Sequence, residues 1–213
     1  MLNGAKLREL YYRVIEEAER PLPKADMMYL VGETRPNQSS VLDRASEFSG
    51  LIGIIGYEDT EQRIGYPGSD VWMPELLKRS IPRERIVPIM GSLIQMGDKE
   101  IIHTLSEMRA MVRHTKELGI RNIIMVAPRF HILRAFMSGA FALSESFPEL
   151  RLFPVLGTPL DWNDKSSHSQ GLLTGIRADF LVEEMTRIYD YHEQGNLLDP
   201  EDVLAYMDRR DTI

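Results

Sequence analysis

The chain has 213 residues, of which 43% are hydrophobic and 27% charged, so it holds enough apolar side chains for one sizeable core and lacks the composition of a disordered protein. A formal net charge of -7 argues against general binding to nucleic acid or to anionic membranes, because both require a basic surface. Disulfides, thiolate metal sites and cysteine nucleophiles are excluded because the sequence has no cysteine.

Apolar runs of strand length alternate with helical patterns, which is typical of a parallel sheet covered by helices on both faces. The elements expected in chain order are a helix at 4–19, a strand at 26–32, a short helix from Ser40, a strand at 51–56, a helix at 70–80, a strand at 85–89, a helix at 104–118, a strand at 122–127, a helix at 128–143, a strand at 151–157, a helix at 172–193 and a helix from Pro200. Residues 90–103 and the polar segment 157–171 are interpreted as connections.

Right-handed crossovers limit the order of five such strands, and 3-2-1-4-5 is the simplest. The predicted fold is therefore an α/β, doubly wound, mostly parallel five-stranded sheet of Rossmann-like type with extra C-terminal helices. The whole chain, 1–213, is expected to form one domain, with a core at about 26–156 and a helical extension at 172–210. In this order strands one and four are neighbours, and ligands bind beyond the carboxyl ends of such a pair.

The stretch "NIIMVAPRFHILRAF", residues 122–136, changes from a buried strand to a polar segment at this point. Arg129, His131 and Arg134 are predicted in the first two turns of a helix, where cations oppose the helix dipole and so need another reason to be present. We expect a pocket for an anion, with His131 as acid, base or hydrogen-bond donor. The alternative is a structural helix start with snorkelling arginines and a packed histidine.

The loop "GETRPNQSS" after the first strand offers Gly32, Arg35 and Asn37 as ligand-binding residues, and Arg44 follows in the next helix. It has neither the GxGxxG nor the P-loop spacing, so no dinucleotide or phosphate mechanism is assigned. The alternative is a polar turn with a helix cap and a surface ion pair, because Ser40 and Asp43 resemble a capping box with Asp in place of Glu.

Thr104 and Glu107 also have capping-box spacing, which competes with a ligand-binding role for Thr104 and a catalytic role for Glu107. No histidine pair has metal-ligand spacing, so no metal site is predicted. His168 is interpreted as a surface-loop residue, and Glu183 and Glu184 as a solvated helix face.

The Gly-ended first strand, Arg44, "HTLSEMRAM" and above all "IIMVAPRFHILRA" resemble the YdcF/SanA/ElyC-like family, a bacterial group long labelled a domain of unknown function. The residues that match its pattern are Gly32, Arg44, Thr104, Glu107, Phe130, His131, Arg134 and Ala135. The sequence departs from that pattern at Val126 and Ala127 and after the second strand, where "IGYED" replaces serine-glycine-glycine. The soluble YdcF type is the nearer comparison, and the resemblance implies S-adenosylmethionine as a ligand.

The sequence thus predicts an enzyme-like protein that binds a small anionic molecule of the phosphate, nucleotide or S-adenosylmethionine type through arginines. A transferase or a phosphoester or glycosyl-phosphate hydrolase would fit, and Mg²⁺ could assist without a readable motif. A non-catalytic ligand sensor and a regulatory interaction protein are the alternatives. A cytoplasmic location is expected, because no signal peptide or apolar run of membrane-spanning length is present, and the oligomeric state stays open.

Overall fold

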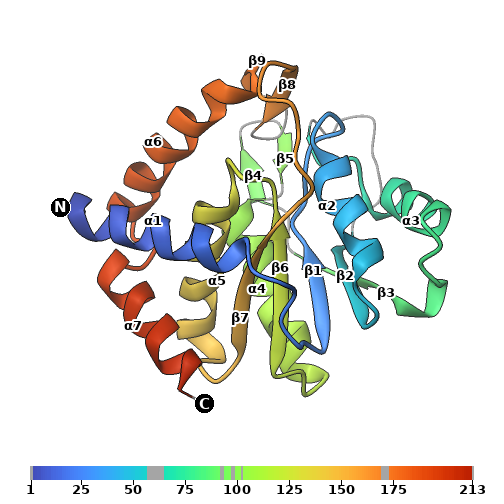
Figure 1. Ribbon diagram of the computed structural model, residues 1–213, viewed down its shortest axis with the longest axis horizontal. Coiled ribbons are helices and arrows are strands. Elements are labelled where there is room, and N and C mark those ends of the chain that lie inside the picture. Colours follow the sequence, from blue (N-terminus) through green and yellow to red (C-terminus); the bar gives the residue numbers. More distant parts are fainter. Residues whose placement is uncertain are drawn as a thin grey trace.

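A computed structural model of the protein describes residues 2–56, 65–91, 94–96, 99–101, 103–168 and 173–212. Its centre is a five-stranded sheet with the order β3-β2-β1-β6-β7, and every neighbouring pair is parallel (Figure 1). The strands are β1 (Met27–Leu30), β2 (Leu51–Ile55), β3 (Ile86–Ile89), β6 (Asn122–Ala127) and β7 (Arg151–Leu156). The predicted fold class and the 3-2-1-4-5 order are confirmed.

Helices cover both faces of the sheet, which is why the central strands are apolar along their whole length. All four residues of β1 are buried, and in β6 only Asn122 is partly exposed. The helices are α1 (Gly4–Ala18), α2 (Gln38–Arg44), α3 (Ser69–Lys78), α4 (Thr104–Glu117), α5 (Ile132–Ser146), α6 (Phe180–Glu193) and α7 (Pro200–Asp211). Among the helices of the described ranges, none is long and apolar enough to cross a membrane.

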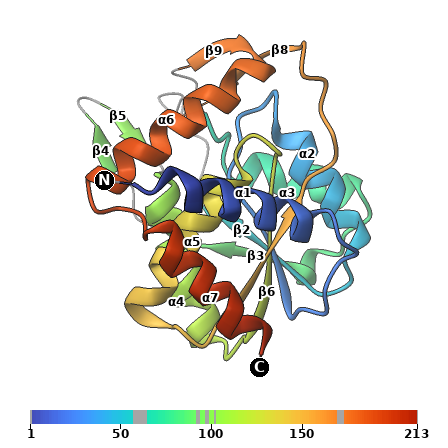
Figure 2. The ribbon, with the colours of Figure 1, turned by 60° about the vertical axis from the view of Figure 1, so that its left-hand side comes forward.

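The helices α4 and α5 pack against each other, α4 contacting β2 and β3 and α5 contacting β6 and β7. Right-handed crossovers put α2 and α3 on the opposite face. The helix α1 contacts β7, and α7 contacts both α1 and α5 (Figure 2). The extra C-terminal helices predicted from the sequence, α6 and α7, are therefore present.

The edge strand β7 is covered by α7. The backbone N–H of Leu152 donates to Tyr206 Oη at 2.8 Å, and Arg210 Nη1 donates to the Leu152 carbonyl oxygen at 2.6 Å. These bonds satisfy backbone groups that an exposed edge would offer to another strand.

Two predicted helix starts are wrong. The helix α5 begins at Ile132 and not at Pro128, because residues 128–131 form a turn that the His131 N–H closes by donating to the Pro128 carbonyl at 2.9 Å. The helix α6 begins at Phe180 and not at 172, because the strand β9 (Leu173–Ile176) and a 3-10 turn (Arg177–Asp179) precede it.

Two segments predicted as plain connections contain hairpins. Segment 90–103 contains the strands β4 (Ile94–Met96) and β5 (Lys99–Ile101), which pair with each other. The polar segment 157–171 contains β8 (Lys165–His168), which pairs with β9, the strand that follows this segment. In β8 the buried positions are Ser166 and His168, so burial alternates while hydrophobicity does not. A search for apolar alternation cannot find such a strand.

Both predicted capping boxes are also wrong. The N-cap of α2 is Asn37, and the Ser40 hydroxyl donates to the Thr158 carbonyl at 2.8 Å. The N-cap of α4 is His103, whose Nδ1 accepts from the Leu105 N–H at 3.2 Å. The side chains of Thr104 and Glu107 are therefore not used as caps, and both reach other parts of the fold.

Candidate functional site

The site lies where the winding of the sheet reverses, between β1 and β6. These strands run side by side in parallel, and the Val31 N–H donates to the Val126 carbonyl at 3.0 Å. Their carboxyl ends lead into residues 32–34 and residues 128–131, the two segments that the topology predicted to meet. In doubly wound folds the crevice beyond such a pair of ends is the usual place for a ligand.

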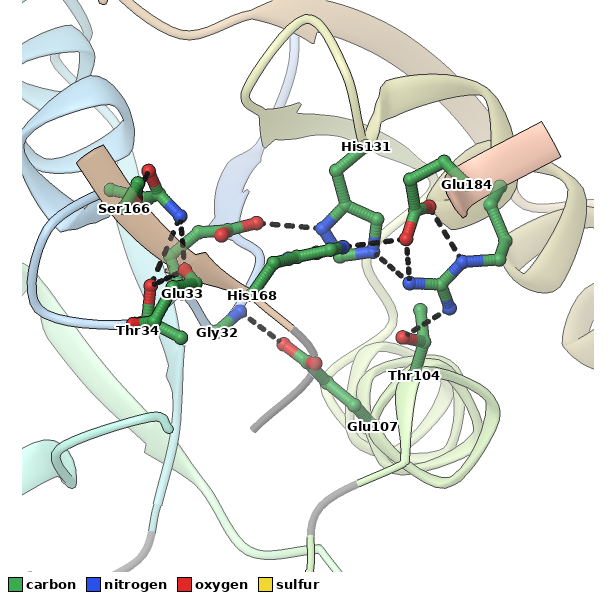
Figure 3. A network of polar contacts seen from close by, with 12 residues as sticks. Gly32, Glu33, Thr34, Thr104, Glu107, His131, Ser166, His168 and Glu184 are labelled. Carbon is green, nitrogen blue, oxygen red and sulfur yellow. Dashed lines mark hydrogen bonds and ion pairs between the residues drawn. The ribbon is translucent and has the colours of Figure 1, made fainter. Parts of the chain in front are cut away.

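Glu33 and His131 face each other across this reversal point. Glu33 follows β1, His131 is the N-cap of α5, and His131 Nδ1 lies 2.6 Å from Glu33 Oε1 (Figure 3). Their side chains are only 1% and 4% exposed, respectively. Burial, then the charges of Glu184 and Glu107, raise the pKa of Glu33 well above its ordinary value, against the effect of Arg134. Its surroundings therefore favour the neutral, protonated form.

Arg134 lies one turn further along α5 and binds three partners. Its Nε and Nη2 donate to the two carboxylate oxygens of Glu184 at 2.6 and 2.9 Å, and its Nη1 donates to Thr104 Oγ1 at 2.8 Å. Glu184 comes from α6, so this bidentate ion pair joins α6 to α5 in a buried position (Figure 3). Paired groups of this kind hold two elements in a fixed geometry.

The same guanidinium fixes the protonation of His131. Arg134 Nη2 lies 3.0 Å from His131 Nε2, and because a guanidinium can only donate, Nε2 must accept. The proton of the neutral imidazole is then on Nδ1, which donates to Glu33. Burial, then the charge of Arg134, lower the pKa of His131 well below its ordinary value, consistent with the neutral form.

His168, at the end of β8, completes the network. Its Nε2 lies 2.5 Å from Glu184 Oε1. Burial would raise the pKa of Glu184, but Arg134, His131 and His168 together lower it well below its ordinary value, so Glu184 is a carboxylate. His168 is packed between Phe130 and Phe180, with ring centroids at 4.9 and 5.3 Å. The predictions of a surface histidine and of a solvated Glu184 are wrong.

Glu107 reaches the crevice from α4. Its Oε1 accepts from the Gly32 N–H at 2.7 Å and from the Tyr29 hydroxyl at 2.9 Å, and the residue is 3% exposed. Burial raises the pKa of Glu107 to about 7, although both hydrogen bonds and Arg134 oppose the shift. Both bonds end on the same oxygen, Oε1.

A second polar cluster fastens the β8–β9 hairpin to the loop after β1. Asn37 Nδ2 donates to Thr34 Oγ1 at 3.0 Å and to the Ser167 carbonyl at 2.9 Å, while its Oδ1 accepts from Ser166 at 2.8 Å and from Arg177 Nε at 3.2 Å. Asn37 is fully buried. The hairpin is therefore a fixed wall beside the site.

The structure brings most of the predicted site residues together. Gly32, Thr104, Glu107, His131 and Arg134 belong to one set of contacts, and Asn37 lies in the adjoining cluster.

The other predicted arginines lie outside that set. Arg44 pairs with Glu47 at 2.5 Å, and Arg129 pairs with Glu19 at 2.6 Å with both side chains exposed. Arg35 is exposed and has an interaction partner. Arg129 and His131 precede the first residue of α5, so of the three predicted cations only Arg134 lies within the helix.

Three residues of the network were missed from the sequence. Glu33 is an acid directly after a buried strand that ends in Gly32, and this position was a usable signal. Glu184 occupies the buried stripe of α6 with Phe180 and Ile188, at a spacing of four residues, which separates it from its neighbour Glu183. For His168 no local signal exists, because its strand carries no apolar alternation.

The site does not have the positive charge of the arginine-lined anion pocket that was predicted from the sequence. The carboxylate of Glu184 compensates Arg134, and the groups nearest to the reversal point are the carboxyls of Glu33 and Glu107. Within the described ranges no group of three or more His, Asp or Glu residues is arranged to hold a metal ion.

No protein-family model matches the chain, and no curated protein matches it.

Proposed function

We propose that the protein is an enzyme that acts on a small molecule bound in the crevice between the carboxyl ends of β1 and β6, with Glu107 as the proton-transfer group. The observation that carries this proposal is the state of Glu107: a buried carboxyl with a pKa of about 7, anchored by one oxygen to the Gly32 N–H and the Tyr29 hydroxyl. A general acid or base works best when its pKa lies near the working pH.

The proposed role of His131 is to position and not to transfer protons. Both ring nitrogens are engaged, by Glu33 and by Arg134, and the ring is buried. Glu33 is thereby oriented, and in its protonated form its hydroxyl hydrogen can be donated to a ligand oxygen. Two neighbouring carboxyls with different protonation are a common arrangement for acid–base chemistry.

We propose a ligand of the nucleotide or S-adenosylmethionine type. In doubly wound folds, an acidic side chain beside the crevice binds ribose hydroxyls, and the carboxyls of this site lie beside it. A phosphate group would need Mg²⁺ beside these carboxyls, since bare like charges repel. The resemblance to the YdcF/SanA/ElyC-like family supports the same ligand class, because five of the matching residues gather at this place: Gly32, Thr104, Glu107, His131 and Arg134.

A non-catalytic sensor is the second candidate. It is favoured by the density of the network, in which four of the five Arg134 N–H groups and both His131 ring nitrogens are engaged with protein groups. A sensor needs a preformed pocket and no proton transfer, so Glu107 would then serve only to bind.

The first experiment identifies the ligand. The purified protein is denatured, and released small molecules are identified by mass spectrometry, with a thermal-shift screen of nucleotides, phosphosugars and S-adenosylmethionine alongside. The second compares Glu107→Gln with Glu117→Gln, an exposed position on the same helix. Turnover should fall by about 10²- to 10⁴-fold in Glu107→Gln with ligand binding retained, and should be unchanged in Glu117→Gln. Full turnover in Glu107→Gln would refute the enzyme proposal.

A further inference from the structure

A groove separate from the crevice lies between α1 and α6. The two helices are in contact at the N-terminal end of α1, since a Cβ built on Gly4 would lie 3.9 Å from Tyr189 Oη. From this end the helices diverge (Figures 1 and 2). The start of α5 forms the floor. The groove has a volume of about 280 Å³, near the lower limit of ~300–1,000 Å³ for small-molecule sites. We call it the α1–α6 groove.

The walls of the α1–α6 groove are apolar. Residues of three helices line it: Leu7, Tyr11, Leu133, Leu181, Met185 and Ile188. Leu181 and Met185 are 37% and 36% exposed, so part of their surface has no cover from the described chain. Covering apolar surface of this kind stabilises a complex, because it removes that surface from water.

Two arginines, Arg8 and Arg129, also line the groove. In the described part of the protein Arg8 makes no ion pair, while Arg129 pairs with Glu19 between two exposed side chains. An exposed ion pair of this kind contributes little to stability, so a ligand carboxylate can take the place of Glu19 at small cost. The one acid lining the groove, Glu184, is already compensated by Arg134.

We propose that the α1–α6 groove is a binding site for an amphipathic carboxylate, a molecule with an aliphatic or aromatic body and one anionic end. The body lies against the leucine and methionine side chains, and the carboxylate meets Arg8 or Arg129. Glu107 does not line the groove, so binding there does not depend on Glu107. The Arg134–Glu184 pair, in contrast, belongs to both the buried network and the groove lining.

The test uses decanoate, below its micelle concentration, as the probe and isothermal titration calorimetry on the full chain. Met185→Glu puts a charge into the groove, and Val182→Glu is its matched control, because Val182 is 70% exposed on the same helix and does not line the groove. Decanoate binding should weaken by more than about tenfold in Met185→Glu and stay within about twofold in Val182→Glu.

The charge is tested with Arg8→Glu against Arg20→Glu, an exposed arginine outside the groove. Arg8→Glu should weaken decanoate binding by about three- to tenfold, and Arg20→Glu should not. Decanol should bind the wild-type protein more weakly than decanoate does.

Three results would overturn the proposal: no heat of binding with decanoate, equal binding of decanol, or equal losses in Met185→Glu and Val182→Glu. A dimer in light scattering that excludes decanoate would show that a second copy covers the groove, which also overturns it. Glu107→Gln should leave decanoate binding unchanged, so failure here and failure of the proposed enzyme function are distinguishable.

Discussion

Replacing Glu184 by glutamine should strongly destabilise the fold. The carboxylate accepts two hydrogen bonds from Arg134, at 2.6 and 2.9 Å, and lies 2.5 Å from His168 Nε2, with both ion-pair side chains at most 4% exposed. Removing one partner of a buried pair costs about 3–5 kcal/mol, because the other charge is left buried without compensation. Glutamine keeps one acceptor oxygen, so we expect a loss of about 3 kcal/mol, or about 6–12 °C in Tm for a chain of this size.

The assay is urea and thermal unfolding followed by circular dichroism, with Glu183→Gln as the control. Glu183 is the exposed neighbour on the same helix, and its replacement should change stability by less than about 0.5 kcal/mol. The pKa of Glu184 is lowered on folding, so its contribution is present above its unfolded pKa of about 4.5 and is lost as the pH falls below that value. The gap between wild type and Glu184→Gln should therefore shrink in acid.

Equal stability of the two glutamine variants at neutral pH would refute the buried-pair reasoning. A double variant, Arg134→Met with Glu184→Met, gives a second check. It leaves no buried charge from the pair, so it should cost less than the sum of the two single replacements.

Three further outcomes can be measured by unfolding. The pKa of Glu107 is raised to about 7 on folding, so the wild-type protein loses stability as the pH rises from about 4.5, the unfolded pKa of Glu107, to 7. Over that pH range Glu107→Gln should gain about 3 kcal/mol of stability relative to the wild type, and a difference that stays constant with pH would contradict the raised pKa. Gly157→Ala should destabilise by about 1–3 kcal/mol, because the new Cβ would lie 2.2 Å from Ser40 Oγ and 2.7 Å from the Ser40 carbonyl oxygen, and a neutral result would mean that the loop moves freely. Tyr206→Phe should cost about 1–2 kcal/mol, because the Leu152 N–H loses its acceptor and the Leu150 carbonyl its donor; an unchanged free energy of unfolding would show that water replaces both bonds.

The sheet could be predicted because its signals are local and redundant. A continuous apolar run such as residues 122–127 is compatible with a central parallel strand, and the handedness of crossovers leaves few strand orders. The boundaries after such strands were harder to predict. Residues 128–131 contain a proline and polar groups that suit either a turn or a helix start, and the bond from the His131 N–H to the Pro128 carbonyl, three residues back, closes them as a turn.

The site was predicted less completely, because its partners are distant in sequence. Thr104 and Glu107 have the spacing of a capping box, and nothing nearby shows that Gly32 and Arg134 bind them instead. The arginines at 44, 129 and 134 look alike in sequence, yet only Arg134 turns inward. The charge of buried Arg134 is compensated by a carboxylate 50 residues further along the chain, and the spacing of residues in the sequence does not reveal this pairing.

Glu184 and His168 follow the last strand of the central sheet in the sequence, and this affects the order in which parts of the protein can fold during synthesis. All five sheet strands have been synthesised by residue 156, while the carboxylate that Arg134 needs follows 50 residues after it. A nascent chain of that length can form the sheet but holds a cation at its centre without a counter-ion. Arg134 is therefore compensated only once α6 has docked. A chain cut before α6 should keep the sheet's secondary structure and become a substrate for proteases.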